Sequence, residues 1–113
     1  MRPFIAALAA QMFLAAPAQA QEWVVLRAPQ ITQALADVRL HYEDGAWREF
    51  RSSGATLYFA RGESWGYWRT QGDKYCSQWP PRVEWACYEL HQSGTTFRFV
   101  DDLGNSTIGR VAQ

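Results

Sequence analysis

The sequence predicts a small, mainly β domain: one short N-terminal helix, then an antiparallel meander of about seven strands curled into a small barrel or a bent sheet. Three observations predict it. After residue 38 the apolar residues recur with a period of two, which is typical of half-buried strands. Turn-forming clusters of Gly, Ser, Asn and Asp interrupt the chain every 8 to 12 residues or so. The chain also has two cysteines, enough to staple such a domain with one disulfide.

The first 20 residues have the features of a cleavable secretory signal. Arg2 supplies a positive charge, Phe4–Ala16 contains one polar residue, and Ala18–Ala20 fits the A-x-A pattern of signal peptidase. A membrane-spanning helix needs about 20 apolar residues, and this apolar stretch is shorter. The alternative is a helix that packs on the domain. We therefore expect 1–20 to be removed, and 21–113 to form one domain in the periplasm or outside the cell, without a membrane anchor.

The charge pattern excludes two classes of partner. Without Arg2 the mature chain has 10 basic and 11 acidic side chains, scattered along its length. A nucleic-acid binder would show a basic stripe, and a membrane-surface binder would show a basic amphipathic helix. The sequence has neither pattern. The expected partner is another periplasmic or secreted protein, or an unknown small ligand.

The helix is predicted at the start of the mature chain. Pro29 suits a first helical turn, because its missing N–H would be unpaired there. Ile31, Leu35 and Val38 follow at helical spacing, which indicates a helix of about two turns that plugs or covers one end of the barrel. The apolar stretch Trp23–Leu26 before it is a short strand or a tether.

The strands follow from alternation and from the turns between them. Val38, Leu40 and Tyr42 alternate with Arg39 and His41, as in a half-buried strand. Similar segments continue to the end of the chain, each after a turn signal. The strand segments are 38–42, 46–50, 55–59, 64–70, 74–78, 85–90, 95–100 and 106–111.

Cys76 and Cys87 are predicted to form a disulfide across a hairpin. They lie on consecutive strand segments, and an exported protein meets an oxidising compartment. Closing a loop of about a dozen residues contributes roughly 3 kcal/mol. A metal site is the weaker interpretation, because two thiols with only His41 and His91 make a poor zinc set, and there is no C-x-x-C redox motif. No metal or cofactor is predicted.

The hairpin between the cysteines carries a candidate binding tip. Trp79, Arg82 and Trp85 lie there together with two prolines. Tryptophan and arginine often dominate protein interfaces, and prolines reduce the entropy lost on binding. The alternative is that the two tryptophans only cover the end of the core.

One catalytic pattern is formally present. Gly62–Gly66 matches the G-x-S-x-G nucleophile elbow around Ser64, and Asp73 and His91 follow in hydrolase order. The elbow must join a strand to a helix, whereas here the chain continues as strand. We therefore predict no catalytic residue and no enzymatic activity.

Several segments resemble a family of short, uncharacterised exported proteins of Gram-negative bacteria. The cysteine hairpin, Gly72–Pro81 followed by Trp85–Tyr88, carries the specific part of the resemblance. Weaker parts are Gly66–Trp68, Ile31–Leu35 and Phe97–Val100. The resemblance covers about residues 28–110 and implies export and fold, but no activity or catalytic residue.

The functional expectation is therefore a non-enzymatic periplasmic binding or interaction module. The first alternative is an inhibitor of a secreted protease or lysozyme, because small disulfide-closed barrels suit that role. The second is a small serine hydrolase built on Ser64.

Overall fold

The structure, a computed structural model, describes residues 22–112, and the predicted signal segment 1–20 lies outside these residues. The described part contains one helix and nine β-strands. Their bounds are β1 Val24–Val25, α1 Ala28–Leu35, β2 Val38–Tyr42, β3 Trp47–Phe50, β4 Ala55–Phe59, β5 Glu63–Gln71, β6 Lys74–Gln78, β7 Ala86–Ser93, β8 Thr96–Val100 and β9 Ser106–Val111.

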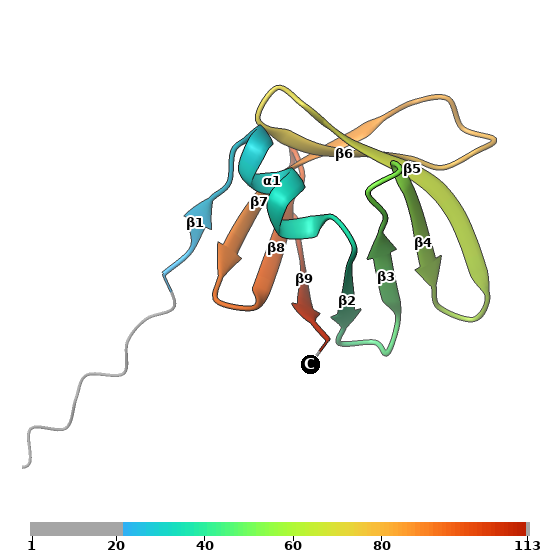
Figure 1. The fold of residues 1–113 in the computed structure, drawn as a ribbon, viewed down its shortest axis with the longest axis horizontal. Coiled ribbons are helices and arrows are strands. Elements are labelled where there is room, and N and C mark those ends of the chain that lie inside the picture. The colour runs from blue at the N-terminus through green and yellow to red at the C-terminus, as the bar shows by residue number, and fades with distance from the viewer. Residues whose placement is uncertain (1–21, 113) are drawn as a thin grey trace, which may run out of the picture.

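The strands β2 to β9 form a closed ring (Figure 1). Each pairs antiparallel with the next strand along the chain, and β9 pairs back with β2, where Tyr42 lies opposite Gly109. The short β1 adds to β7 outside the ring. This confirms the mainly β class and the barrel. Its eight strands match the eight predicted segments one for one, where the predicted total was about seven. Closure joins the two edge strands that an open meander would expose.

The inner face of the barrel is aromatic at its centre. Tyr75 on β6 is fully buried, and its ring centroid lies 5.1 Å from that of Phe99 and 5.7 Å from that of Phe50. Trp68 and Tyr88 complete the cluster at 6.4 and 6.2 Å from Tyr75. These residues come from five different strands, so one cluster of rings holds both sides of the barrel together.

Helix α1 covers one opening of the ring (Figure 1). Pro29 lies in its first turn, and Ile31 and Leu35 are fully buried within the same apolar cluster as the inward strand residues. The backbone N–H of Ala28 donates to Asp73 in the β5–β6 turn, 3.2 Å away, which ties the helix start to the sheet. The predicted short helix and its place at one end of the barrel are confirmed.

The helix gives way to the first barrel strand at Val38. The sequence placed this residue both at the end of the apolar helical spacing and at the start of the first strand segment; the helix ends at Leu35, and Val38 is the first residue of β2. The chain reverses at Asp37, whose φ of 60° lies in the left-handed region that Asp tolerates better than most residues. The Asp37 carboxylate accepts the Ser52 N–H at 3.1 Å, and this bond holds the reversal against the β3–β4 turn.

The cysteine hairpin is also confirmed. Cys76 and Cys87 are directly opposed on β6 and β7 and form the disulfide. Beyond it the chain leaves the ladder over residues 79–85, where the Arg82 N–H donates to the Trp79 carbonyl at 3.0 Å. The Pro80–Pro81 peptide bond is cis. This loop lies at the side of the ring in Figure 1, as a continuation of β6 and β7.

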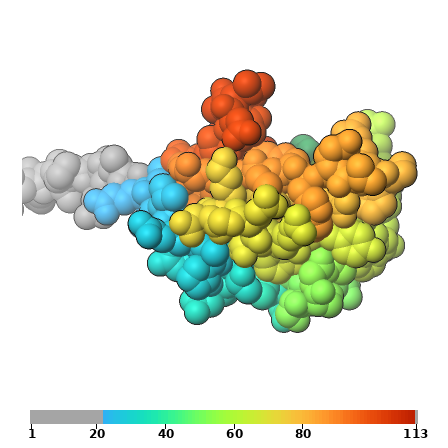
Figure 2. Space-filling view, turned by 90° about the horizontal axis from the view of Figure 1, so that it is seen from above, coloured from blue at the N-terminus to red at the C-terminus, as the bar shows by residue number. Residues whose placement is uncertain are grey.

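The two ends of the barrel differ. Register places Val38 and Phe50 at the end covered by α1, and the β2–β3 and β8–β9 turns at the other end. In Figure 2 the helix (blue to cyan) lies on one side of the molecule, and the β8–β9 turn (red) projects from the opposite side. The helix-covered end is filled with side chains, and the other end is open.

Candidate functional site

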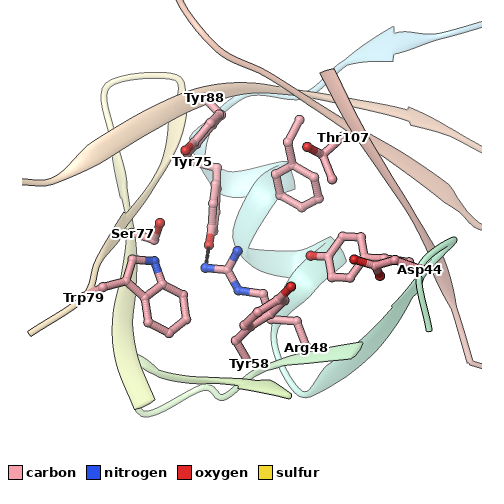
Figure 3. A pocket seen from close by; sticks show the side chains of 10 residues that line it. Asp44, Arg48, Tyr58, Tyr75, Ser77, Trp79, Tyr88 and Thr107 are labelled. Carbon is pink, nitrogen blue, oxygen red and sulfur yellow. Dashed lines mark hydrogen bonds between the residues drawn. The ribbon is translucent and has the colours of Figure 1, made fainter. Parts of the chain in front are cut away.

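A cavity of about 220 Å³ lies inside the barrel at the end away from α1. Figure 3 looks into it, with the helix behind the side chains. Seven of the eight barrel strands contribute a lining residue, and β5 does not. The residues that line the cavity are Tyr42, Asp44, Arg48, Tyr58, Tyr75, Ser77, Trp79, Tyr88, Phe99 and Thr107. An eight-stranded barrel is just wide enough either to be filled by side chains or to hold one small ligand.

Arg48 reaches the centre of this cavity (Figure 3). Side chains alternate along β3, so Arg48 shares the inward face with Phe50. Its Nη2 donates to the Tyr75 hydroxyl, and its Nε donates to Thr56 Oγ1 at 3.1 Å. Both acceptors are neutral oxygens. No Asp or Glu oxygen lies within 4.0 Å of this guanidinium among residues 22–112.

Aromatic faces surround the same guanidinium. Its Cζ lies 4.9 Å from the ring centroid of Phe50, 5.0 Å from that of Trp79 and 5.4 Å from that of Tyr75. Such contacts favour a cation, but they do not neutralise it. The two hydrogen bonds use two of the five N–H donors of an arginine. The cavity therefore contains a positive charge with unused donors.

Tyr42 and Tyr75, two of the tyrosines around Arg48, remain uncharged at neutral pH. Burial raises the pKa of Tyr75 to about 12, although the Arg48 charge and the Ser77 side chain oppose the shift. Burial also raises the pKa of Tyr42, again against the nearby Arg48. Because neither phenol ionises near neutral pH, neither supplies the negative charge that would balance Arg48.

Trp79 forms one wall of the cavity because β5 has a glycine opposite it. A Cβ atom on Gly66 would lie 2.7 Å from Cε3 of the Trp79 ring and 2.5 Å from the Gln78 carbonyl oxygen. The bare backbone lets the indole pack directly on β5. On its other side the Trp79 ring meets Tyr58 edge to face, with 6.3 Å between centroids. The position of this wall depends on the missing side chain of Gly66.

The predicted binding tip has a second environment outside the barrel. Trp79, Arg82 and Trp85 all border a groove of about 620 Å³ on the loop 79–85. Trp85 is half-buried, with the Arg69 guanidinium 3.8 Å above its ring, whereas Arg82 is exposed. Trp79 faces both this groove and the inner cavity. The tip as an interaction site, and with it the inhibitor hypothesis, stays a prediction.

The sequence-based prediction of the binding site did not include Arg48, although the sequence contained an indication of its role. The alternation that puts Phe50 on the buried face of its strand also puts a charged residue, Arg48, on that face. A charge on a buried strand face needs a partner or a function. Tyr58, Tyr75 and Tyr88 are inward-facing as well, but an aromatic residue on a core face is ordinary and gave no comparable signal.

The residues of the formal hydrolase pattern lie in separate environments. Ser64 is exposed near the start of β5, and Asp73 is bonded to the start of α1. His91 Nε2 lies 2.6 Å from Glu89, and its Nδ1 accepts from Arg98 at 3.1 Å. Within the described range no hydrogen bond joins any two of Ser64, Asp73 and His91. The same range contains no cluster of three His, Cys, Asp or Glu residues that could hold a metal ion.

The fold and the cavity define the class of protein: a small closed antiparallel barrel, covered by a helix at one end and hollow at the other. Comparison with protein-family models, curated proteins and solved structures finds no match. The resemblance to short exported proteins therefore stays a prediction. The one helix in the range 22–112 is too short to span a bilayer.

Proposed function

We propose that this protein is a non-enzymatic binding module that holds one small molecule, with an anionic group, in the open end of the barrel. One observation carries the proposal: Arg48 presents its charge inside the cavity with no acidic partner within 4.0 Å in the described part of the chain. A partly buried charge without a counter-charge is costly, and an anionic ligand would offset that cost.

The rest of the lining complements an anion attached to an apolar body. Arg48 has unused N–H donors directed at the cavity, and guanidinium groups bind carboxylates with two parallel hydrogen bonds. The rings of Tyr58, Trp79 and Tyr88 offer flat apolar walls. The volume of about 220 Å³ is below the range of about 300 to 1,000 Å³ typical for drug-sized ligands, so the ligand is small.

The cellular setting belongs to the same proposal. Export to the periplasm or the medium follows from the signal-like residues 1–20, and the Cys76–Cys87 disulfide is compatible with an oxidising compartment. A binding module outside the cytoplasm would meet small solutes from the surroundings. The proposed partner is therefore a solute rather than a nucleic acid.

Calorimetric titration with matched probes tests the anion requirement. Para-methylbenzoate and para-methylbenzamide have nearly the same shape and differ in charge. We expect the carboxylate to bind and the amide to bind at least tenfold more weakly. Arg48→Gln should reduce carboxylate affinity by about tenfold to a hundredfold, since hydrogen bonds to a charged group contribute about 1.5–3 kcal/mol.

Two controls separate binding from folding. Arg61→Gln removes an equal charge from an exposed turn residue that does not line the cavity, and it should leave affinity unchanged. Urea unfolding of each variant shows whether Arg48→Gln is still folded under the titration conditions. Equal binding of the carboxylate and the amide, or full carboxylate affinity in folded Arg48→Gln, would contradict the proposal.

A further inference from the structure

The cavity contains a second charged group, Asp44. It lies in the β2–β3 turn at the open end of the barrel and is exposed. One of its oxygens accepts the Ala46 N–H at 3.0 Å, which fixes the turn. Within residues 22–112 this carboxylate forms no ion pair. The lining therefore has one unpaired charge of each sign.

The two charges occupy different depths of the cavity. Arg48 is anchored to Tyr75 and Thr56 in the buried interior, and Asp44 lies at the edge (Figure 3). Both act on Tyr42, whose pKa is raised by burial: the Arg48 charge opposes that rise, and the Asp44 charge adds to it. They are near enough to influence the same side chain, yet they are not paired with each other. A ligand in the cavity would meet both.

Aromatic rings line the cavity around the two charges. Tyr42 and Tyr58 have centroids 6.4 Å apart and planes tilted by 59°, and Trp79 packs edge to face on Tyr58. Faces of this kind attract ammonium groups as well as apolar carbon. An anion without a positive group would be attracted by Arg48 and repelled by Asp44. A positive group on the same molecule would convert that repulsion into attraction.

We propose that the ligand is a small zwitterion, with its anionic group on Arg48, its ammonium group toward Asp44 and its apolar body against the rings of Tyr42, Tyr58 and Trp79. This inference rests on the proposed function and specifies its ligand class: an amino acid or another amine-bearing acid. Asp44 then selects among anions that Arg48 alone would accept. It is a specificity-determining residue rather than an anchor.

A charge series tests the zwitterion. Para-(aminomethyl)benzoate adds an ammonium group to para-methylbenzoate at the opposite end of the ring, and phenylalanine adds one to phenylpropionate next to the carboxylate. The two pairs sample two charge separations. We expect at least one zwitterion to bind the unaltered protein threefold or more tightly than its matched carboxylate. Para-methylbenzylamine, which has only the positive charge, should bind most weakly.

Asp44→Asn is the diagnostic variant, because asparagine keeps the side-chain oxygen that accepts the Ala46 N–H. It should lower zwitterion affinity to the level of the matched carboxylate and leave or improve carboxylate binding. Glu43→Gln makes the same charge change one residue away, outside this cavity, and should preserve the preference. Circular dichroism of both variants checks that the barrel is intact.

The outcomes separate the two proposals. If zwitterions bind no better than carboxylates, or if Asp44→Asn keeps their advantage, the zwitterion inference is wrong. The anion site still stands as long as Arg48→Gln weakens carboxylate binding by tenfold or more. If Arg48→Gln changes neither ligand class, the proposed function fails, and the zwitterion inference fails with it. Loss of the preference in Glu43→Gln as well as Asp44→Asn would point to the overall charge of the turn, and would also overturn the role of Asp44.

Discussion

At the scale of single residues, the cavity depends on what is missing as much as on what is present. Gly66 lies on the inward face of β5, close to the Trp79 ring and to the Gln78 carbonyl oxygen. Gly109 does the same on β9, where a Cβ would lie 3.1 Å from the Tyr42 ring. Both glycines let an aromatic side chain approach the strand backbone closely. The walls of the site are therefore set by close backbone approach.

Gly66→Ala should destabilise the domain and displace Trp79. The added methyl group would meet a backbone oxygen at 2.5 Å, and this atom cannot move without disturbing the β5–β6 ladder. Overpacking of this kind costs about 1–3 kcal/mol. Urea unfolding measures the loss, and near-ultraviolet circular dichroism reports the tryptophan environment. Gly62→Ala is the matched control, since a Cβ there meets nothing within 4 Å; equal effects of the two variants would contradict this prediction.

At the scale of elements, local patterns predicted most of the fold. Alternation and turn residues located each barrel strand to within a few residues, because the side-chain period of two is a local property. Pro29 and the Ile31–Leu35 spacing located the helix for the same reason. The junction between helix and strand was predicted less well, since the reversal at Asp37 depends on bonds to Phe50, at the end of β3, and to Ser52, in the β3–β4 turn.

The site was less predictable, because it is assembled by strand pairing over long sequence distances. Arg48 and Tyr75 are 27 residues apart and meet only when the ring is complete. Trp79 was predicted as a binding residue because it is a tryptophan and lies in the hairpin loop. That its side chain lines the barrel interior depends on Gly66 of another strand. The sequence can thus indicate that a charge lies on a core face without indicating which residues surround it.

The β6–β7 hairpin is the element on which the cavity depends most. Tyr75 and Ser77 flank one half-cystine, Tyr88 follows the other, and Trp79 leaves the end of β6. Three of the ten lining residues therefore lie on the strands that the disulfide joins, and a fourth, Trp79, directly follows β6. The disulfide therefore constrains the strands that carry the cavity residues, as well as restricting the unfolded chain.

Replacing both cysteines by alanine should lower stability and ligand affinity together. For a separation of 11 residues, chain entropy predicts a loss of roughly 3 kcal/mol in the free energy of unfolding. Urea titration measures that loss, and calorimetry with para-methylbenzoate under folding conditions measures the effect on binding. Full affinity in the folded double variant would show that β6 and β7 hold the cavity without the disulfide.

At the scale of the whole molecule, one side chain links the core to the cavity. The Tyr75 ring contacts Phe50, Trp68, Tyr88 and Phe99 from four other strands, while its hydroxyl accepts from Arg48. Because this ring packs against residues of four other strands, a negative charge on its phenol would lie buried among all of them. The pH range in which the phenol is neutral is therefore also the range in which the barrel is expected to be stable.

The pKa of Tyr75 predicts how stability should fall in alkali. Burial raises it to about 12 in the folded state, against about 10 in the unfolded chain, so folding favours the protonated phenol. Its contribution is complete below pH 10 and is lost as the pH rises toward 12, on the order of 3 kcal/mol in all. Urea unfolding at intervals from pH 7 to 12 should therefore show a decline in the free energy of unfolding that begins near pH 10.

Tyr75→Phe, which has no phenol to ionise, is the control variant. It should be less stable at pH 7, because Arg48 loses its acceptor, but its stability should decline less above pH 10. An identical alkaline slope in both proteins would show that other groups, such as the partly buried Tyr42, dominate.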